Sequence, residues 1–178
     1  APTVLVVFGA TGDLMARKIV PSLFHLSREG LLPPLLRVVG FSRRDWSDDD
    51  LRAHVKAIIA EKYPSADALD EFLALFTYQQ GTFADESAYA ELARFTEDAA
   101  REWNACTNKL FYLAVPPQNY ETILGNLARS GLTAACSAET GYTRVLVEKP
   151  FGHDVASSKA LDDLLASLFR EEQIYRID

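Results

Sequence analysis

The sequence has few of the residues that cross-link a fold or hold a metal, with two cysteines, three histidines and one methionine among 178 residues. Cys106 and Cys136 are far apart in the sequence, and His25, His54 and His153 form no cluster. This pattern lacks the spacings of a zinc site and the cysteine density of a disulfide-stapled secreted domain. We therefore expect neither a disulfide framework nor a metal site. The cysteine content fits a protein of the reducing cytosol.

Positive charge and long apolar runs are also scarce. Lysine and arginine total 18 against 25 acidic residues, which gives a net charge of −7 and argues against a nucleic-acid surface. A local basic pocket for an anionic ligand is compatible with that balance. No apolar run is long enough to cross a bilayer, and no basic-then-apolar leader opens the sequence. We expect a cytoplasmic protein with no nucleic-acid or membrane partner.

The chain has enough apolar residues for one substantial core, at 48% of the sequence, and shows no internal repeat. Short apolar runs alternate with longer segments of helical periodicity, which indicates a Rossmann-like, doubly wound parallel α/β sheet in a single domain. Strands are predicted over residues 4–8, 36–41, 76–81, 110–115 and 144–147. Helices are predicted from about residue 19 to 30, after an N-cap at Ser47, and over 66–75, 86–104, 120–127 and 155–169.

The most informative segment follows the first apolar run and reads Gly9, Ala10, Thr11, Gly12, Asp13 and Leu14. A glycine pair between a strand and a helix permits a tight turn and lets backbone N–H groups approach a pyrophosphate at the helix N-terminus. The pair lacks the full spacing of the common dinucleotide fingerprint, so a plain turn is the alternative. Thr11 and Asp13 are interpreted as capping the first helical turn.

Arg43 and Arg44 come directly after the second predicted strand, where this class of fold meets the adenosine ribose. An acidic residue there would bind the ribose hydroxyls, whereas an arginine makes a charge-assisted contact with a 2′-phosphate. The pattern favours NADP over NAD. The alternative is a solvated loop charge.

Lys149 follows a buried strand and precedes Pro150. Ligands of open α/β sheets bind at the carboxyl ends of the strands, and the proline holds Lys149 in an extended conformation. We therefore interpret Lys149 as a functional residue, in preference to a solubilising one.

Four segments together resemble glucose-6-phosphate dehydrogenases: residues 9–14, residues 111–117, residues 147–152 and residues 169–178. The resemblance spans the whole chain in the expected order. It implies that residues 1–178 form the NADP-binding domain of an enzyme that oxidises glucose 6-phosphate to 6-phosphogluconolactone. The C-terminal substrate and oligomerisation domain is then absent from this chain, and the intact protein is a homo-oligomer.

The resemblance also implies roles for individual residues. Residues 9–14 hold the pyrophosphate, Arg43 the 2′-phosphate, and Tyr120 lies at the cofactor. Lys149 contacts both cofactor and substrate, and Asp178 orients a catalytic histidine that lies beyond this chain. The chain alone is then expected to be inactive.

Two alternatives remain open at this level. The glucose-fructose oxidoreductase group also ends a dinucleotide domain with Glu-Lys-Pro, so Lys149 does not separate the two groups. An NADP-binding sensor or regulatory module would use the turn at Gly9 without chemistry, and the missing catalytic base motivates that hypothesis.

Overall fold

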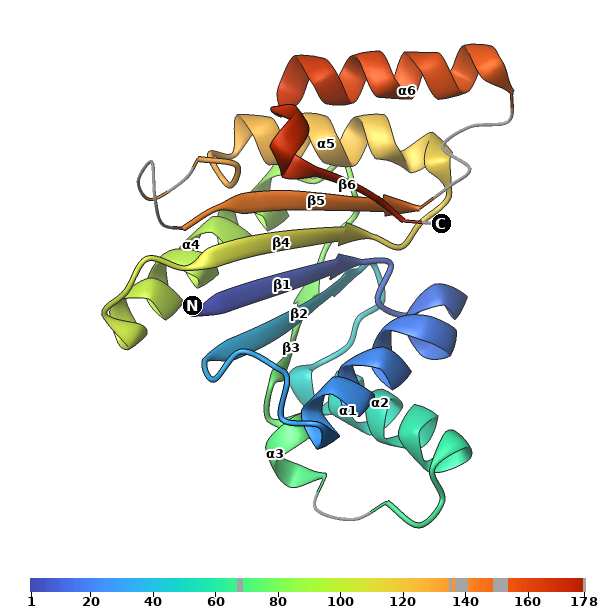
Figure 1. Ribbon diagram of the computed structural model, residues 1–178, viewed down its shortest axis with the longest axis vertical. Coiled ribbons are helices and arrows are strands. Elements are labelled where there is room, and N and C mark those ends of the chain that lie inside the picture. Colours follow the sequence, from blue (N-terminus) through green and yellow to red (C-terminus); the bar gives the residue numbers. More distant parts are fainter. Residues whose placement is uncertain (67–68, 135, 137–140, 149–153, 178) are drawn as a thin grey trace.

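Six strands form one parallel sheet in the order β3-β2-β1-β4-β5-β6 (Figure 1). The computed structural model describes residues 1–66, 69–134, 136, 141–148 and 154–177. The strands are β1 (Thr3–Phe8), β2 (Leu36–Ser42), β3 (Phe76–Gln80), β4 (Asn108–Leu113), β5 (Thr143–Glu148) and β6 (Ile174–Ile177). The helices are η1 (Met15–Ile19), α1 (Val20–Arg28), α2 (Asp48–Lys62), α3 (Asp70–Leu73), α4 (Glu86–Trp103), η2 (Pro117–Asn119), α5 (Tyr120–Arg129), α6 (Val155–Leu168) and η3 (Glu171–Gln173).

The first strand is the centre of the sheet, and every one of its residues is buried. It pairs with β2 on one side and β4 on the other, so that Phe8 is level with both Phe41 and Leu113. Both faces of a central parallel strand are covered, which explains why its apolar run is continuous and not alternating. The predicted strand over residues 4–8 is confirmed.

Helices cover both faces of the sheet. Side chains of η1, α1 and α2 share one apolar cluster with β1 and β2, whereas those of α4, α5 and α6 share a second cluster with β1, β4 and β5. Figure 1 shows α1 and α2 on one side of the sheet, with α5 and α6 stacked on the other. The predicted doubly wound α/β class is therefore confirmed, and the carboxyl ends of all strands lie at one edge.

Most element boundaries agree with the predictions, and Ser47 caps α2 as expected. Its hydroxyl accepts a hydrogen bond from the Asp50 backbone N–H at 3.1 Å, and the Asp50 carboxylate accepts one from the Ser47 N–H at 2.9 Å. This reciprocal pair satisfies two N–H groups that the helix start leaves unpaired.

The helix after β1 is less regular than predicted. Its first part, η1, is a π-helical turn, and the backbone N–H of Val20 bonds to the Met15 carbonyl. Pro21 follows directly and has no N–H to continue the usual hydrogen-bond pattern. A widened turn before a proline accommodates this loss.

Two predictions near the sheet edges need correction. The helix expected over residues 66–75 is only α3, because Leu75 joins the sheet: its carbonyl accepts the Val38 N–H at 2.8 Å. The strand β6 was not predicted, since its four residues carry the charge of Arg176 between Ile174 and Ile177. It pairs with β5 in the sheet, and its Arg176 forms ion pairs with Asp162 of α6 and Glu171 of η3.

The expectation drawn from cysteine content is also wrong, because the structure joins Cys106 and Cys136 in a disulfide. Spacing in the sequence gives no indication of this pair. It arises because β4 and β5 are neighbours, which brings the segments that precede them together.

None of the helices that the structure describes combines the length and apolar character of a membrane-spanning segment.

Candidate functional site

The turn after β1 requires glycine at its first position. Gly9 has φ = +87°, and a Cβ there would lie 2.4 Å from the Ala114 carbonyl oxygen and 2.8 Å from Cγ1 of Val115. Both the backbone conformation and the close approach of the segment after β4 exclude a side chain. The chain consequently turns sharply at the carboxyl edge, directly beside β4.

Part of this turn is held by hydrogen bonds within the protein. The N–H groups of Gly9 and Ala10 both donate to the Phe41 carbonyl, at 2.9 and 3.2 Å, and the Gly12 N–H donates to the Gly9 carbonyl at 3.0 Å. These bonds connect the turn to the end of β2. A Cβ on Gly12 would lie 3.2 Å from the Gly9 oxygen, so this second glycine also keeps the turn tight.

The capping roles expected of Thr11 and Asp13 are not found. No side chain among the described residues caps the start of η1, and the Asp13 carboxylate instead forms an ion pair with Arg17 at 2.8 Å. The two residues are four positions apart, where side chains of a helix meet, and both are largely exposed. This pair raises the pKa of Arg17, first through its hydrogen bond with Asp13.

The end of β2 presents the two arginines differently. Arg43 is exposed, and its main-chain carbonyl accepts a hydrogen bond from the Gln80 side chain at 3.4 Å. The Arg44 guanidinium instead lies 5.7 Å from the ring centre of Trp46, which is cation–π distance. Both arginines are exposed, and it is Arg44 that contacts the ring.

Tyr78 of β3 holds the segment that carries Arg43 and Arg44 (the arginine segment, residues 42–44), and the sequence did not single it out. Its phenol lies 2.5 Å from the Ser42 hydroxyl and donates to the Arg44 carbonyl at 2.7 Å. Burial raises the pKa of Tyr78, so the phenol stays protonated and able to donate across the neutral range. An aromatic residue in a predicted edge strand gives no sequence signal for such a role.

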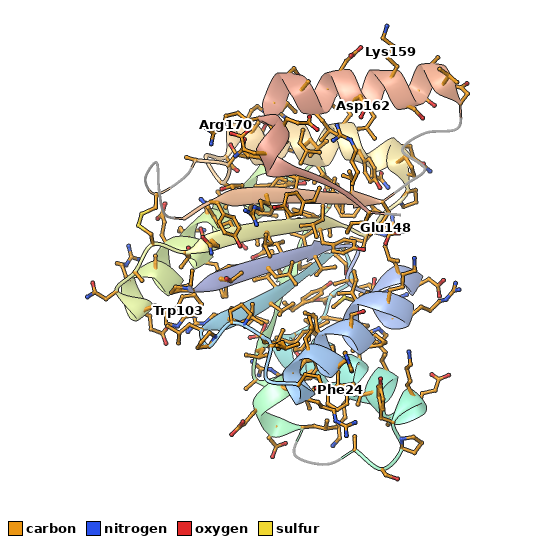
Figure 2. All side chains as sticks on the ribbon, viewed as in Figure 1. Phe24, Trp103, Glu148, Lys159, Asp162 and Arg170 are labelled. Carbon is orange, nitrogen blue, oxygen red and sulfur yellow. A yellow bond between two sulfur atoms is a disulfide. The ribbon has the colours of Figure 1, made fainter. Side chains whose placement is uncertain are left out.

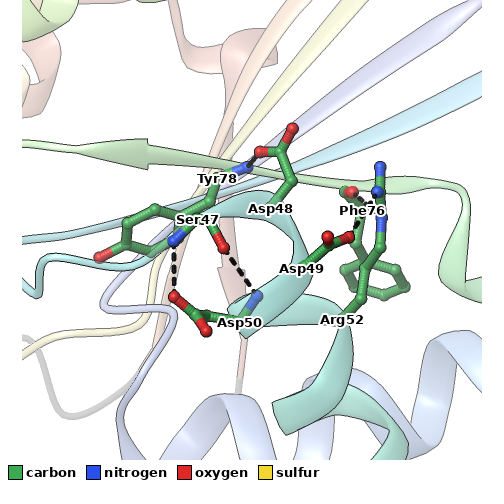
Figure 3. A network of polar contacts seen from close by, with 7 residues as sticks. All are labelled: Ser47, Asp48, Asp49, Asp50, Arg52, Phe76 and Tyr78. Carbon is green, nitrogen blue, oxygen red and sulfur yellow. Dashed lines mark hydrogen bonds and ion pairs between the residues drawn. The ribbon is translucent and has the colours of Figure 1, made fainter.

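The backbone of Tyr78 is in turn fixed by the first turn of α2 (Figure 3). Its N–H donates to the Asp48 carboxylate at 2.7 Å, and Arg52 donates to the Phe76 carbonyl at 3.0 Å. These contacts replace the neighbouring strand that the edge strand β3 lacks. They connect α2, β3 and the arginine segment into one support.

The carboxyl ends of β4 and β5 contribute the other half of the edge. Glu148 ends β5, at the carboxyl edge of the sheet (Figure 2). Its carboxylate accepts a hydrogen bond from the Tyr112 phenol at 2.7 Å and lies 3.9 Å from the Lys18 ammonium. Burial, and then the hydrogen bond and charge of Glu148, raise the pKa of Tyr112.

Glu148, Tyr112 and Lys18 were not singled out from the sequence. The signal that could have found the first two is the alternation of side chains along neighbouring strands: Tyr112 is level with Leu146, and Glu148 lies two residues further on the same face. Lys18 could have been found from its place on the helix that starts at the glycine turn.

Tyr120 lies at the same edge, at the start of α5, and is 2% exposed. Burial raises its pKa, and a backbone hydrogen bond with Glu148 acts in the opposite direction. The structure therefore brings Tyr120 and Glu148 together. Lys149, Pro150 and Asp178 lie outside the described residues.

The edge thus combines a glycine turn, the start of a helix, and the basic side chains Lys18 and Arg43. Together with the strand order, this defines a Rossmann-type nucleotide-binding domain. The family model described as "Glucose-6-phosphate dehydrogenase, NAD binding domain" matches residues 6–178. The chain belongs to this family, which decides against the glucose-fructose oxidoreductase group.

Relatives in curated collections agree with that assignment. The chain is 40% identical over 176 residues to a glucose-6-phosphate 1-dehydrogenase of Bacillus subtilis, covering 98% of this chain and 35% of the relative. It is 38% identical over 180 residues to glucose-6-phosphate 1-dehydrogenase 2 of Mycobacterium tuberculosis, covering 99% and 35%. The chain spans about a third of the length of these relatives.

Solved structures give the same result. A glucose-6-phosphate dehydrogenase in complex with its substrate glucose 6-phosphate is 38% identical, with a TM-score of 0.86 over 99% of this chain and 36% of that one. A glucose-6-phosphate 1-dehydrogenase from Mycobacterium avium is 30% identical, with a TM-score of 0.83 over 100% and 36%.

Proposed function

We propose that this chain is the NADP-binding domain of an enzyme that oxidises glucose 6-phosphate to 6-phosphogluconolactone. The observation that carries the proposal is the family match over residues 6–178, on a chain whose carboxyl edge has the features of a dinucleotide site. The similar structure that holds glucose 6-phosphate supports the substrate. The homo-oligomer and the cytoplasmic location expected from the resemblance are part of this proposal.

A dinucleotide fits the residues at this edge. The pyrophosphate would lie over residues 9–14, where the absence of a Cβ at Gly9 and Gly12 keeps the turn tight and its backbone accessible. The backbone N–H groups of Thr11, Asp13 and Leu14, at the start of the helix, are the donors that we assign to it. Tyr120 would support the cofactor from the start of α5.

Arg43 would bind the 2′-phosphate of NADP. It is exposed, it follows β2, and the neighbouring guanidinium already lies at cation–π distance from Trp46. Arginine matches the planar, bidentate geometry of a phosphate, and a ribose without the phosphate offers it no charged partner. NADP would therefore bind more tightly than NAD.

The bound cofactor would accept a hydride from C1 of the sugar. In this chain, Lys149 would attract the substrate phosphate and the cofactor, and Asp178 would orient the group that removes the proton of the C1 hydroxyl. That base lies outside this chain, so the isolated domain should bind the cofactor and lack turnover.

Calorimetric titration of the chain with NADP and NAD tests the proposal. The expected result is preferential NADP binding that Arg43→Ala reduces far more than NAD binding. Arg44→Ala is the matched control, because it removes the same charge one residue away and should leave the preference intact.

Equal losses for both cofactors in Arg43→Ala would remove Arg43 from the 2′-phosphate site. Tight NADP binding by this chain, together with inactivity of a longer protein that includes the missing residues, would instead favour a sensor. Restored turnover in that longer protein would support the enzyme.

A further inference from the structure

We propose that Cys106 and Cys136 form a reversible redox site, in which oxidation joins the segments that enter β4 and β5. The disulfide connects residues 30 positions apart, and their Cα atoms are 5.7 Å apart, a separation typical of disulfides. Figure 2 shows the S–S bond at the opposite end of the strands from Glu148. The site is therefore distinct from the nucleotide edge.

Contacts other than the disulfide hold the same two segments together. The Lys109 ammonium donates to the Ala134 carbonyl at 2.8 Å, and the Asn108 side chain accepts the Tyr142 N–H at 3.2 Å. The Lys109 backbone N–H donates to the Tyr142 carbonyl at 2.8 Å. Because these bonds do not depend on sulfur, the two thiols stay close together after reduction and can pair again.

Gly141 provides the space that the second cysteine needs. It has φ = +74°, and a Cβ there would lie 2.7 Å from the Cys136 Cβ and 3.2 Å from the Thr107 carbonyl oxygen. The Cys136 N–H donates to the Gly141 carbonyl at 3.4 Å. A side chain at this position would push Cys136 away from Cys106, so the local backbone favours the pair.

Solvent can reach the pair, because Cys136 is exposed and Cys106 is half-buried. The oxidant is a small-molecule disulfide such as glutathione disulfide. The Cys136 thiolate attacks one of its sulfurs and releases one glutathione thiolate, which takes up the proton lost by Cys136. Cys106 then attacks the mixed disulfide, and its proton goes to the second glutathione released, so two thiols are oxidised and one disulfide is reduced.

Oxidation changes stability rather than the ligand site. The disulfide closes a loop that contains β4 and α5, which restricts the unfolded chain more than the folded one. The nucleotide edge lies at the other end of β4 and β5, roughly 20 Å away for strands of this length. Dinucleotide affinity well below the melting temperature should therefore be the same in both redox states.

The test is to equilibrate the chain in glutathione buffers of increasing oxidation, block free thiols under denaturing conditions, and map the peptides by mass spectrometry. We expect a linkage between Cys106 and Cys136 within single chains, increasing with oxidation and reversed by reductant. The oxidised chain should melt about 5–10 °C higher than the reduced chain. The double variant Cys106→Ser/Cys136→Ser should have one melting temperature in all buffers.

Free thiols at both positions across the whole series, or a disulfide only between two chains, would overturn the proposal. A chain with the Cys106–Cys136 disulfide that has the same melting temperature as the reduced chain would also overturn it. None of these measurements uses a nucleotide, so this proposal and the proposed cofactor function can fail separately.

Discussion

The phenol of Tyr78 donates a hydrogen bond to the main-chain carbonyl of Arg44 at 2.7 Å, which connects the edge strand β3 to the arginines after β2. Tyr78→Phe should therefore reduce the preference for NADP over NAD several-fold, because Arg43 would lose its rigid support. The lost hydrogen bond should also lower the free energy of unfolding by about 1 kcal/mol. Calorimetry with both cofactors and urea unfolding measure the two effects.

Tyr175→Phe is the matched control for this prediction, since Tyr175 is 42% exposed on the opposite edge strand, β6. It should change neither quantity. An unaltered cofactor preference in Tyr78→Phe, with the expected loss of stability, would mean that the hydrogen bond supports the fold alone.

A side chain at Gly9 should be more destabilising than at any exposed glycine of similar conformation. Gly9→Ala combines a positive φ with a Cβ 2.4 Å from a carbonyl oxygen, so we expect a loss of at least about 3 kcal/mol in the free energy of unfolding. Gly30→Ala is the control, because Gly30 has φ = +69° and no atom of the described residues lies within 4 Å of its Cβ position. It should cost only about 1 kcal/mol.

Gly12→Ala separates the turn's role in folding from its role in binding. Its φ is not in the left-handed region, and the nearest atom is 3.2 Å from the Cβ position, so stability should fall by less than about 1 kcal/mol. If the turn holds a pyrophosphate, NADP affinity should nevertheless fall at least tenfold. Full affinity in this variant would leave the segment as a plain turn.

Residues with strong local signals were predictable from the sequence. The apolar runs gave five of the strands, and Ser47 followed by acidic residues predicted the start of α2. Gly9 could be predicted because a strand-to-helix turn at the centre of a parallel sheet requires it. These features depend on neighbours in the sequence.

The missed features depend on strands that are neighbours only after folding. Tyr78, Tyr112 and Glu148 act across strands, and the disulfide depends on the pairing of β4 with β5. The π-helical turn before Pro21 could have been found, since a proline within a long helical pattern disturbs it. Only the packed structure could show the role of Tyr78 and the disulfide.

The hydrogen bond between Tyr112 and Glu148 should contribute measurably to stability, because the Glu148 side chain is only 20% exposed and charged acceptors strengthen such bonds. Tyr112→Phe should lower the free energy of unfolding by about 1–2 kcal/mol. A double-mutant cycle with Glu148→Ala, measured by urea unfolding, isolates the pair. A coupling energy near zero would show that Glu148 is equally well solvated without the phenol.

Acid should destabilise the fold through His54. This side chain lies 5.1 Å from Trp46 between ring centres, and its Nε2 is buried with no hydrogen-bond partner among the described residues. Burial, and then the charge of Arg44, lower the pKa of His54 below its usual value of 6.5. As the pH falls below 6.5, His54 binds a proton in the unfolded chain more readily than in the folded chain. The free energy of unfolding therefore decreases.

His54→Gln should remove this part of the acid sensitivity. The difference in stability between wild type and variant should change between pH 7.5 and pH 5.5, by no more than about 1.4 kcal/mol per pH unit because one proton is involved. Urea unfolding at the two pH values measures it, with His25→Gln on the exposed side of α1 as the control. Parallel stability profiles for wild type and His54→Gln would show that His54 is protonated equally in both states, and that its burial against Trp46 does not exclude the charge.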